Sequence, residues 1–68
     1  MNKWFRHKIH QNAIAKLQEM SHCYRLVFYW IVKDELEQRE HEEVTKMFYV
    51  DKREAINVLF KLDYLEDV

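Results

Sequence analysis

The chain has 68 residues, a formal net charge of −1 and a hydrophobic fraction of 49%. A chain this short forms at most one domain, and we expect residues 1–68 to be a single domain. The near-neutral charge excludes the strongly basic composition typical of many nucleic-acid-binding domains. The single cysteine, Cys23, excludes an internal disulfide, and the absence of glycine excludes the glycine-rich loops that commonly bind phosphate groups.

The first predicted element is a helix over residues 3–20. Apolar side chains recur there at spacings of four, four, four and three residues, at Phe5, Ile9, Ala13, Leu17 and Met20. This spacing is typical of one apolar face of an amphipathic helix.

The next segment, YRLVFYWIV at residues 24–32, is rich in β-branched and aromatic residues and favours a strand. We predict one strand over residues 23–33 and a second over residues 43–50, joined by a charged hairpin tip at residues 34–42. In the expected register Val32 lies opposite Val44, and the bend is near residues 37–39. The alternative is one long helix from about residue 24 to 48, because the charged segment is good helix-forming material.

The last predicted helix covers residues 52–62 and is followed by an acidic tail at residues 63–68. Asp51 and Glu54 have the spacing of a capping box, in which the first residue caps the helix and the second reaches back. The predicted order is therefore helix, strand, strand, helix. We expect an α+β fold, a hairpin packed against two helices, with an all-α three-helix fold as the alternative.

The predicted hairpin has a second apolar face that the two helices need not cover. In the expected register this face carries Val27, Tyr29, Ile31, Met47 and Tyr49. Aromatic residues and methionine are enriched in interface cores. We therefore predict that another protein or a second copy of this chain binds here, although a helix of the same chain covering the face is the alternative.

Charge is unevenly distributed along the chain. Before Glu19 there are cations but no acids, and an aromatic residue lies among them, at Lys3, Trp4, Arg6, Lys8 and Lys16. A basic helix with aromatic residues can bind phosphates and stack on bases, which predicts a nucleic-acid interface as an alternative function. The acids of the hairpin tip, including Glu37, Glu40, Glu42 and Glu43, predict instead a contact with a basic surface on a protein partner.

The sequence carries no catalytic signature and no standard metal motif. His7, His10, His22 and Cys23 are chemically adequate zinc ligands, but their spacing matches no common zinc-binding pattern. We therefore expect no enzyme activity, no metal and no cofactor. Cys23 is interpreted as a small buried hydrophobic residue.

The longest uninterrupted apolar run, at residues 26–32, is much shorter than the roughly 20 residues of a membrane span. We expect no membrane association and a cytoplasmic location. The leading functional hypothesis is a small non-enzymatic intracellular interaction protein that modulates or inhibits another protein, a kind of product common among mobile elements. A nucleic-acid-binding regulator and a self-assembling structural subunit are the alternatives.

Overall fold

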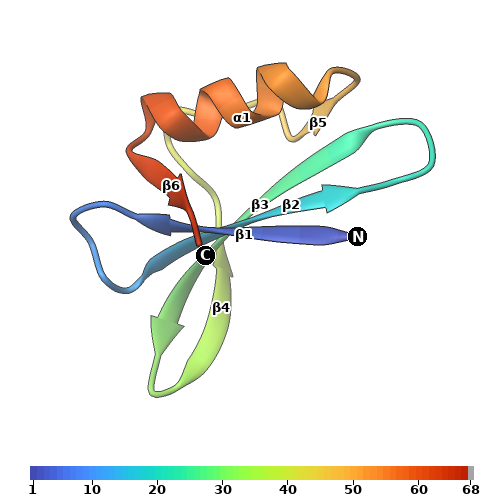
Figure 1. The fold of residues 1–68 in the computed structure, drawn as a ribbon. Coiled ribbons are helices and arrows are strands. Elements are labelled where there is room, and N and C mark those ends of the chain that lie inside the picture. Colours follow the sequence, from blue (N-terminus) through green and yellow to red (C-terminus); the bar gives the residue numbers. More distant parts are fainter. Residues whose placement is uncertain (68) are drawn as a thin grey trace.

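A computed structural model describes residues 1–67 as an antiparallel sheet with one helix (Figure 1). The elements are, in chain order, β1 (Asn2–His7), β2 (Ala13–Glu19), β3 (Tyr24–Val32), β4 (Glu35–Arg39), β5 (Phe48–Tyr49), α1 (Lys52–Lys61) and β6 (Tyr64–Glu66). The strand order is β4-β3-β2-β1-β6, and β5 pairs with β3. The predicted helix–strand–strand–helix fold is therefore wrong, as is the all-α alternative.

The predicted helix over residues 3–20 is a hairpin of β1 and β2, in which Phe5 lies opposite Ala15. A spacing of four residues is also a multiple of two, so Ala13 and Leu17 share a face in a strand as they would in a helix. Ala15, between them, is fully buried, which only a period of two explains. Ile9, which the helical pattern placed in the core, is 68% exposed in the turn.

The turn between β1 and β2 contains no glycine and is held by a histidine side chain. Nδ1 of His7 accepts hydrogen bonds from the backbone N–H groups of Ile9 and His10, both at 3.0 Å. This satisfies backbone donors that would otherwise be free in the loop. The hairpin therefore forms without glycine in its turn.

The strand predicted at residues 23–33 is confirmed as β3, but the hairpin that follows it bends earlier than expected. The chain turns at Lys33 and Asp34, which both have positive φ, 51° and 65°, and Val32 pairs with Glu35. A two-residue turn with two positive φ values matches the right-handed twist of the strands. The predicted bend at residues 37–39, the pairing of Val32 with Val44 and the alternative long helix are all wrong.

Most of the strand predicted at residues 43–50 is a loop. Only β5 is extended and paired, with Phe48 opposite Arg25 and Tyr49 opposite Tyr24. Because the chain turns at Lys33 and Asp34, the charged segment Glu35–Arg39 becomes β4 and pairs with β3. The residues of the predicted second strand that do pair, Phe48 and Tyr49, therefore lie beside the start of β3.

The helix predicted at residues 52–62 is confirmed as α1, and Asp51 caps it by accepting a 2.9 Å hydrogen bond from the backbone N–H of Arg53. Glu54 does not reach back to complete the capping box; Nζ of Lys46 donates to its carboxylate at 3.2 Å. After the helix, Asp63 adopts a φ of 67°. The predicted acidic tail at residues 63–68 instead forms β6, except that Val68 lies outside the described residues.

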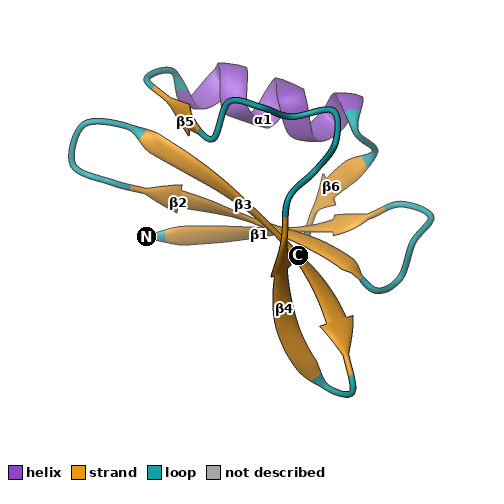
Figure 2. Ribbon diagram, turned by 180° about the vertical axis from the view of Figure 1, so that it is seen from behind, coloured by secondary structure: helices purple, strands orange, loops and turns teal. Residues whose placement is uncertain are grey.

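The core lies between α1 and one face of the sheet, as Figure 2 shows from behind. Leu59 and Ala55 of the helix are fully buried against Phe5 and Leu26 of the sheet. Tyr64 of β6 closes one end of this core, with its ring centroid 5.6 Å from that of Phe28. Ala55 of the helix and Ala15 of the sheet have small side chains, which allows the helix to approach the sheet closely.

We predict that replacing the strained residue at the tight turn stabilises the protein. A non-glycine residue at positive φ costs roughly 1–2 kcal/mol, so Asp34→Gly should raise the free energy of unfolding by about 1 kcal/mol after the added flexibility of the unfolded chain is subtracted. Urea denaturation measures this change. As a control, Thr45→Gly, at a loop position without positive φ, should not stabilise the protein; an equal gain at both positions would contradict the strained turn.

We also predict a loss of stability at high pH through Tyr64. Burial raises the pKa of its hydroxyl above the ordinary value of 10.0, so the folded state retains the proton that the unfolded state releases. The stabilising effect is complete below pH about 10 and disappears as pH rises through the folded pKa. Urea denaturation from about pH 8 to about pH 11 should show a steeper decline in the free energy of unfolding for the native chain than for Tyr64→Phe. Equal declines would contradict the prediction.

Candidate nucleic-acid interface

The face of the sheet opposite α1 has no helix over it within residues 1–67. Strand alternation and register identify its side chains, because every second residue of each strand points to this side. We call this surface the open face. Its members are Asn2, Trp4, Arg6, Ile14, Lys16, Gln18, Arg25, Val27, Tyr29, Ile31, Leu36, Gln38, Phe48 and Leu65.

The centre of the open face is an aromatic pair with a cation over it. The ring centroids of Trp4 and Tyr29 are 5.9 Å apart and tilted by 42°. Nζ of Lys16 lies 5.8 Å from the Trp4 ring centroid and 5.6 Å from that of Tyr29. These distances are within the range of cation–π interactions, so Lys16 lies over both rings while its charge stays near the surface.

All acidic residues of the described strands lie on one face of the sheet, whereas the strand cations are divided between both faces. The four acids in the described strands, Glu19, Glu35, Glu37 and Glu66, all alternate onto the side that faces α1. The open face carries Arg6, Lys16 and Arg25 and no strand acid. Two acids adjoin this surface just beyond the strands: Asp67, after β6, pairs with Arg6 at 3.4 Å, and Glu40, after β4, lines a hollow with Val27 and Gln38. The strands themselves therefore present a positive surface in a chain of net charge −1.

Two polar groups on the open face have no partner among the described residues. They are Oε1 of Gln18 and Nε of Arg25, on residues that lie opposite each other in β2 and β3. Both atoms are buried, and a buried polar atom without a hydrogen bond is unfavourable. A donor and an acceptor are thus left unsatisfied next to the row of residues that contains Trp4 and Lys16.

The residues predicted to bind nucleic acid are only partly brought together. Trp4, Arg6 and Lys16 share the open face, because β1 and β2 are adjacent and the three positions alternate to the same side. Lys3 lies on the other side and pairs with Glu66 at 3.6 Å. Lys8 is exposed in the turn between β1 and β2.

Arg25 and Gln18 were not predicted, although the sequence contains a signal for one of them. Arg25 is the single charged residue in the strand YRLVFYWIV. A cation in an otherwise apolar strand indicates a face that is not part of the core. Gln18 could not be recognised, because the predicted helix hid the alternation of β2.

The residues predicted to bind a partner protein are divided among three places. Val27, Tyr29 and Ile31 lie on the open face, as the alternation of β3 required. Tyr49 is buried in the core, where its hydroxyl donates to the backbone oxygen of Lys46 at 2.7 Å. Met47 lies in the loop before β5, and the predicted face that joined it to Tyr29 does not exist.

The acids predicted at the hairpin tip are also separated. Glu37 lies in β4, where it accepts from Arg39 at 3.3 Å. Glu40, Glu42 and Glu43 are exposed in the loop after β4 and form no ion pair within residues 1–67. The tip itself is Lys33 and Asp34.

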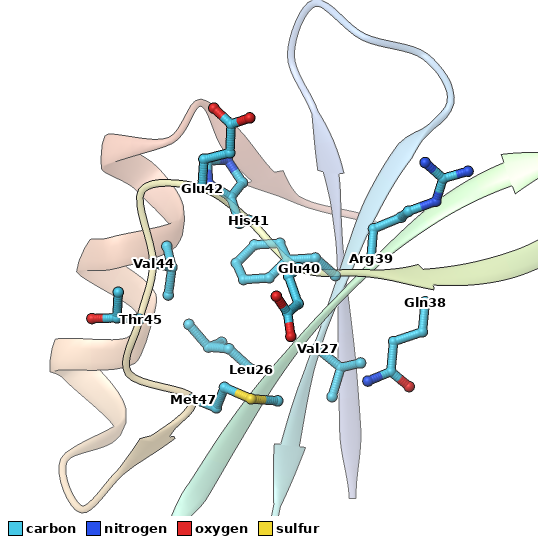
Figure 3. A pocket seen from close by; sticks show the side chains of 11 residues that line it. Leu26, Val27, Gln38, Arg39, Glu40, His41, Glu42, Val44, Thr45 and Met47 are labelled. Carbon is cyan, nitrogen blue, oxygen red and sulfur yellow. The ribbon is translucent and has the colours of Figure 1, made fainter.

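A hollow lies between β3 and the loop of residues 40–47, as Figure 3 shows. Leu26, Val27 and Met47 supply apolar side chains to its wall. Figure 3 shows the carboxylate of Glu40 directed toward this wall and that of Glu42 directed away from it. This is where the predicted residues Val27 and Met47 meet, together with two of the predicted acids. The chemistry suits a cationic side chain with an apolar stem.

The four candidate metal ligands are divided between two turns. His7 and His10 lie around the turn between β1 and β2, with ring centroids 4.6 Å apart. His22 and Cys23 lie in the turn between β2 and β3, where Sγ of Cys23 contacts Sδ of Met20 at 3.9 Å. Within the described part of the chain, no three His, Cys, Asp or Glu side chains are placed to hold a metal ion.

No protein-family model, curated protein or solved structure matches this chain. The helix α1 is too short to cross a membrane, and it is the single helix in residues 1–67. The functional argument therefore depends on the chemistry of the surfaces described above.

Proposed function

We propose that the protein is a non-enzymatic binding module that holds single-stranded nucleic acid on its open face. The observation that carries this proposal is the arrangement of Lys16 over the rings of Trp4 and Tyr29, on a face to which no acidic strand residue points. Proteins that bind single strands combine cations that follow the phosphate backbone with aromatic side chains on which bases stack.

The spacing of these groups suits an unpaired strand better than a duplex. In a duplex the base faces are covered by stacking, so aromatic side chains on a sheet can stack only on bases that are unpaired. Lys16 can move from the rings to a phosphate when a base occupies their surface. Arg25, whose side chain is only partly buried, can donate from its terminal guanidinium nitrogens to a phosphate or a base edge beside them.

The positive charge of Arg6 on the open face is partly neutralised by an acid of the same chain. Its guanidinium pairs with Asp67 at 3.4 Å, with both side chains substantially exposed. Exposed ion pairs contribute little to stability, so phosphate can compete with the carboxylate for Arg6. Asp67 therefore tunes the positive charge of the open face.

The prediction is that aromatic and cationic substitutions on the open face weaken binding in different ways. Fluorescence anisotropy would be measured with labelled single-stranded DNA and RNA of about 12 nucleotides, at several salt concentrations. Trp4→Ala should weaken binding by roughly tenfold, because loss of one base stack costs about 1–3 kcal/mol. Lys16→Gln and Arg25→Gln should each weaken binding and reduce the slope of log affinity against log salt by about 0.7.

Lys3→Gln and Lys61→Gln are the matched controls, since they remove the same charge away from the open face. They should leave the salt slope nearly unchanged, whereas Asp67→Asn should strengthen binding by releasing Arg6. The proposal is wrong if the native chain binds neither oligonucleotide at low salt. It is also wrong if Lys3→Gln reduces the slope as much as Lys16→Gln does.

A protein partner is the second candidate, and the hollow beside the loop of residues 40–47 favours it. The carboxylate of Glu40 is directed toward an apolar wall formed in part by Met47 (Figure 3), which suits a lysine or arginine side chain of a partner. Glu42, on the same loop, adds negative charge at the rim of the hollow. If this hollow binds such a partner, proteins captured from a cell lysate at low salt should be lost with Glu40→Gln/Glu42→Gln. They should remain with the control Glu19→Gln, which changes an exposed acid on β2.

A further inference from the structure

We propose that two copies of this chain associate through β4, by antiparallel pairing of their edge strands about a two-fold axis at Gln38. β4 is the last strand at one edge of the sheet, and no described residue pairs with its outer side. All five of its residues are exposed. Figures 1 and 2 show the β3–β4 hairpin extending away from α1, so a second chain can reach this edge.

The register of the hairpin determines which backbone groups of β4 are free. Val32 and Glu35 flank the two-residue turn and form a hydrogen-bonded pair, and such pairs alternate along an antiparallel ladder. Glu35, Glu37 and Arg39 therefore direct their backbone groups toward β3. Leu36 and Gln38 direct theirs outward, where they are available to another strand.

Hydrogen bonds elsewhere on β3 support this orientation. The N–H of Ile31 donates to Asn12 O at 2.8 Å, on the β2 side. The N–H of Leu26 donates to Met47 O at 2.9 Å, on the side where β4 and β5 lie. Even-numbered residues of β3 thus face β4, which leaves the even-numbered residues of β4 facing outward.

The side chains of β4 complement a second copy in one particular register. With Gln38 on the axis, Glu37 of each chain lies opposite Arg39 of the other. Since Arg39 already pairs with Glu37 of its own chain at 3.3 Å, the four charges alternate in sign around a closed ring. Opposite charges at facing positions stabilise a strand pair, and like charges destabilise it.

The neighbouring register is less favourable. With Glu37 on the axis, the two Glu37 carboxylates lie directly opposite each other at the centre of the pair. The register centred on Gln38 has no such like-charge pair between the strands and places an uncharged amide on the axis. In this register the outward backbone groups of Gln38 pair with those of Gln38 in the other copy. The outward backbone groups of Leu36 pair with those of Glu40 in the other copy.

The pairing would extend the antiparallel sheet continuously across both chains, on the pattern by which an added strand completes an exposed sheet edge. It would bring the two open faces to the same composite sheet, with Gln38 next to its copy and Leu36, which is 50% exposed, beside Glu40. An interface of one strand pair is small, so we expect a weak dimer that depends on concentration. The dimer itself does not depend on nucleic-acid binding.

Sedimentation equilibrium from about 5 μM to about 500 μM, a range that covers weak association, tests the dimer and its charges. The native chain should dimerise, and Glu37→Arg and Arg39→Glu should each be monomeric because the facing residues then repel. An equimolar mixture of these two variants should form a heterodimer, since every facing pair is again of opposite sign. A native chain that stays monomeric, or a mixture that stays monomeric, overturns the proposal.

A cysteine at the axis tests the register without changing charge. The background is Cys23→Ser, because Cys23 is the chain's only cysteine. A hydrogen-bonded antiparallel pair has Cα atoms about 5.5 Å apart, within disulfide range, so Gln38→Cys should cross-link efficiently under mild oxidation. Leu36→Cys should cross-link poorly, because its copy lies several residues away. Equal cross-linking of both, or none at Gln38→Cys, contradicts this register.

Discussion

The packing of α1 against one face of the sheet is the contact on which the rest of the structure depends. Leu59 and Ala55 of the helix, and Phe5 and Ala15 of the sheet, are at most 1% exposed. A two-stranded hairpin alone is marginal in water, so the long ladder and the helix have to stabilise each other. Within residues 1–67 there is one helix for a sheet with two faces, and the other face is therefore left for aromatic and cationic side chains.

Tight turns made without glycine are the second constraint. They determine on which face of the sheet the charged residues of the following strands lie. Lys33 and Asp34 accept positive φ and make β4 the partner of β3. Because that turn has two residues, Glu35 and Glu37 alternate to the side of α1, while Leu36 and Gln38 alternate to the open face. Asp63, also at positive φ, directs β6 back to β1. The segregation of acids from the open face and the exposed edge of β4 are both consequences of these turns.

The prediction is wrong for residues 3–20, where the apolar spacing fits both the helix period and the strand period. It is correct for α1, where the spacing fits only a helix. Spacings of four residues in the segment containing Ala13 and Leu17 are compatible with both helix and strand, and the helical interpretation of this spacing is wrong. The turn between β1 and β2 is stabilised by Nδ1 of His7, and no local sequence pattern predicts this contact. In α1, by contrast, the Asp51 cap and the apolar spacing indicate the same element, and the prediction is confirmed.

By itself, the sequence determined the strand character of β3, the helix α1 and the presence of an apolar face without an obvious cover, because local composition and spacing suffice for each. Only the tertiary structure decided which residues share that face. Trp4, Lys16 and Tyr29 are far apart in the chain, and they meet because β1, β2 and β3 pair in one register. A shift of one residue in the register of any one of these strands would turn its side chain to the opposite face, so the candidate site exists only through long-range pairing.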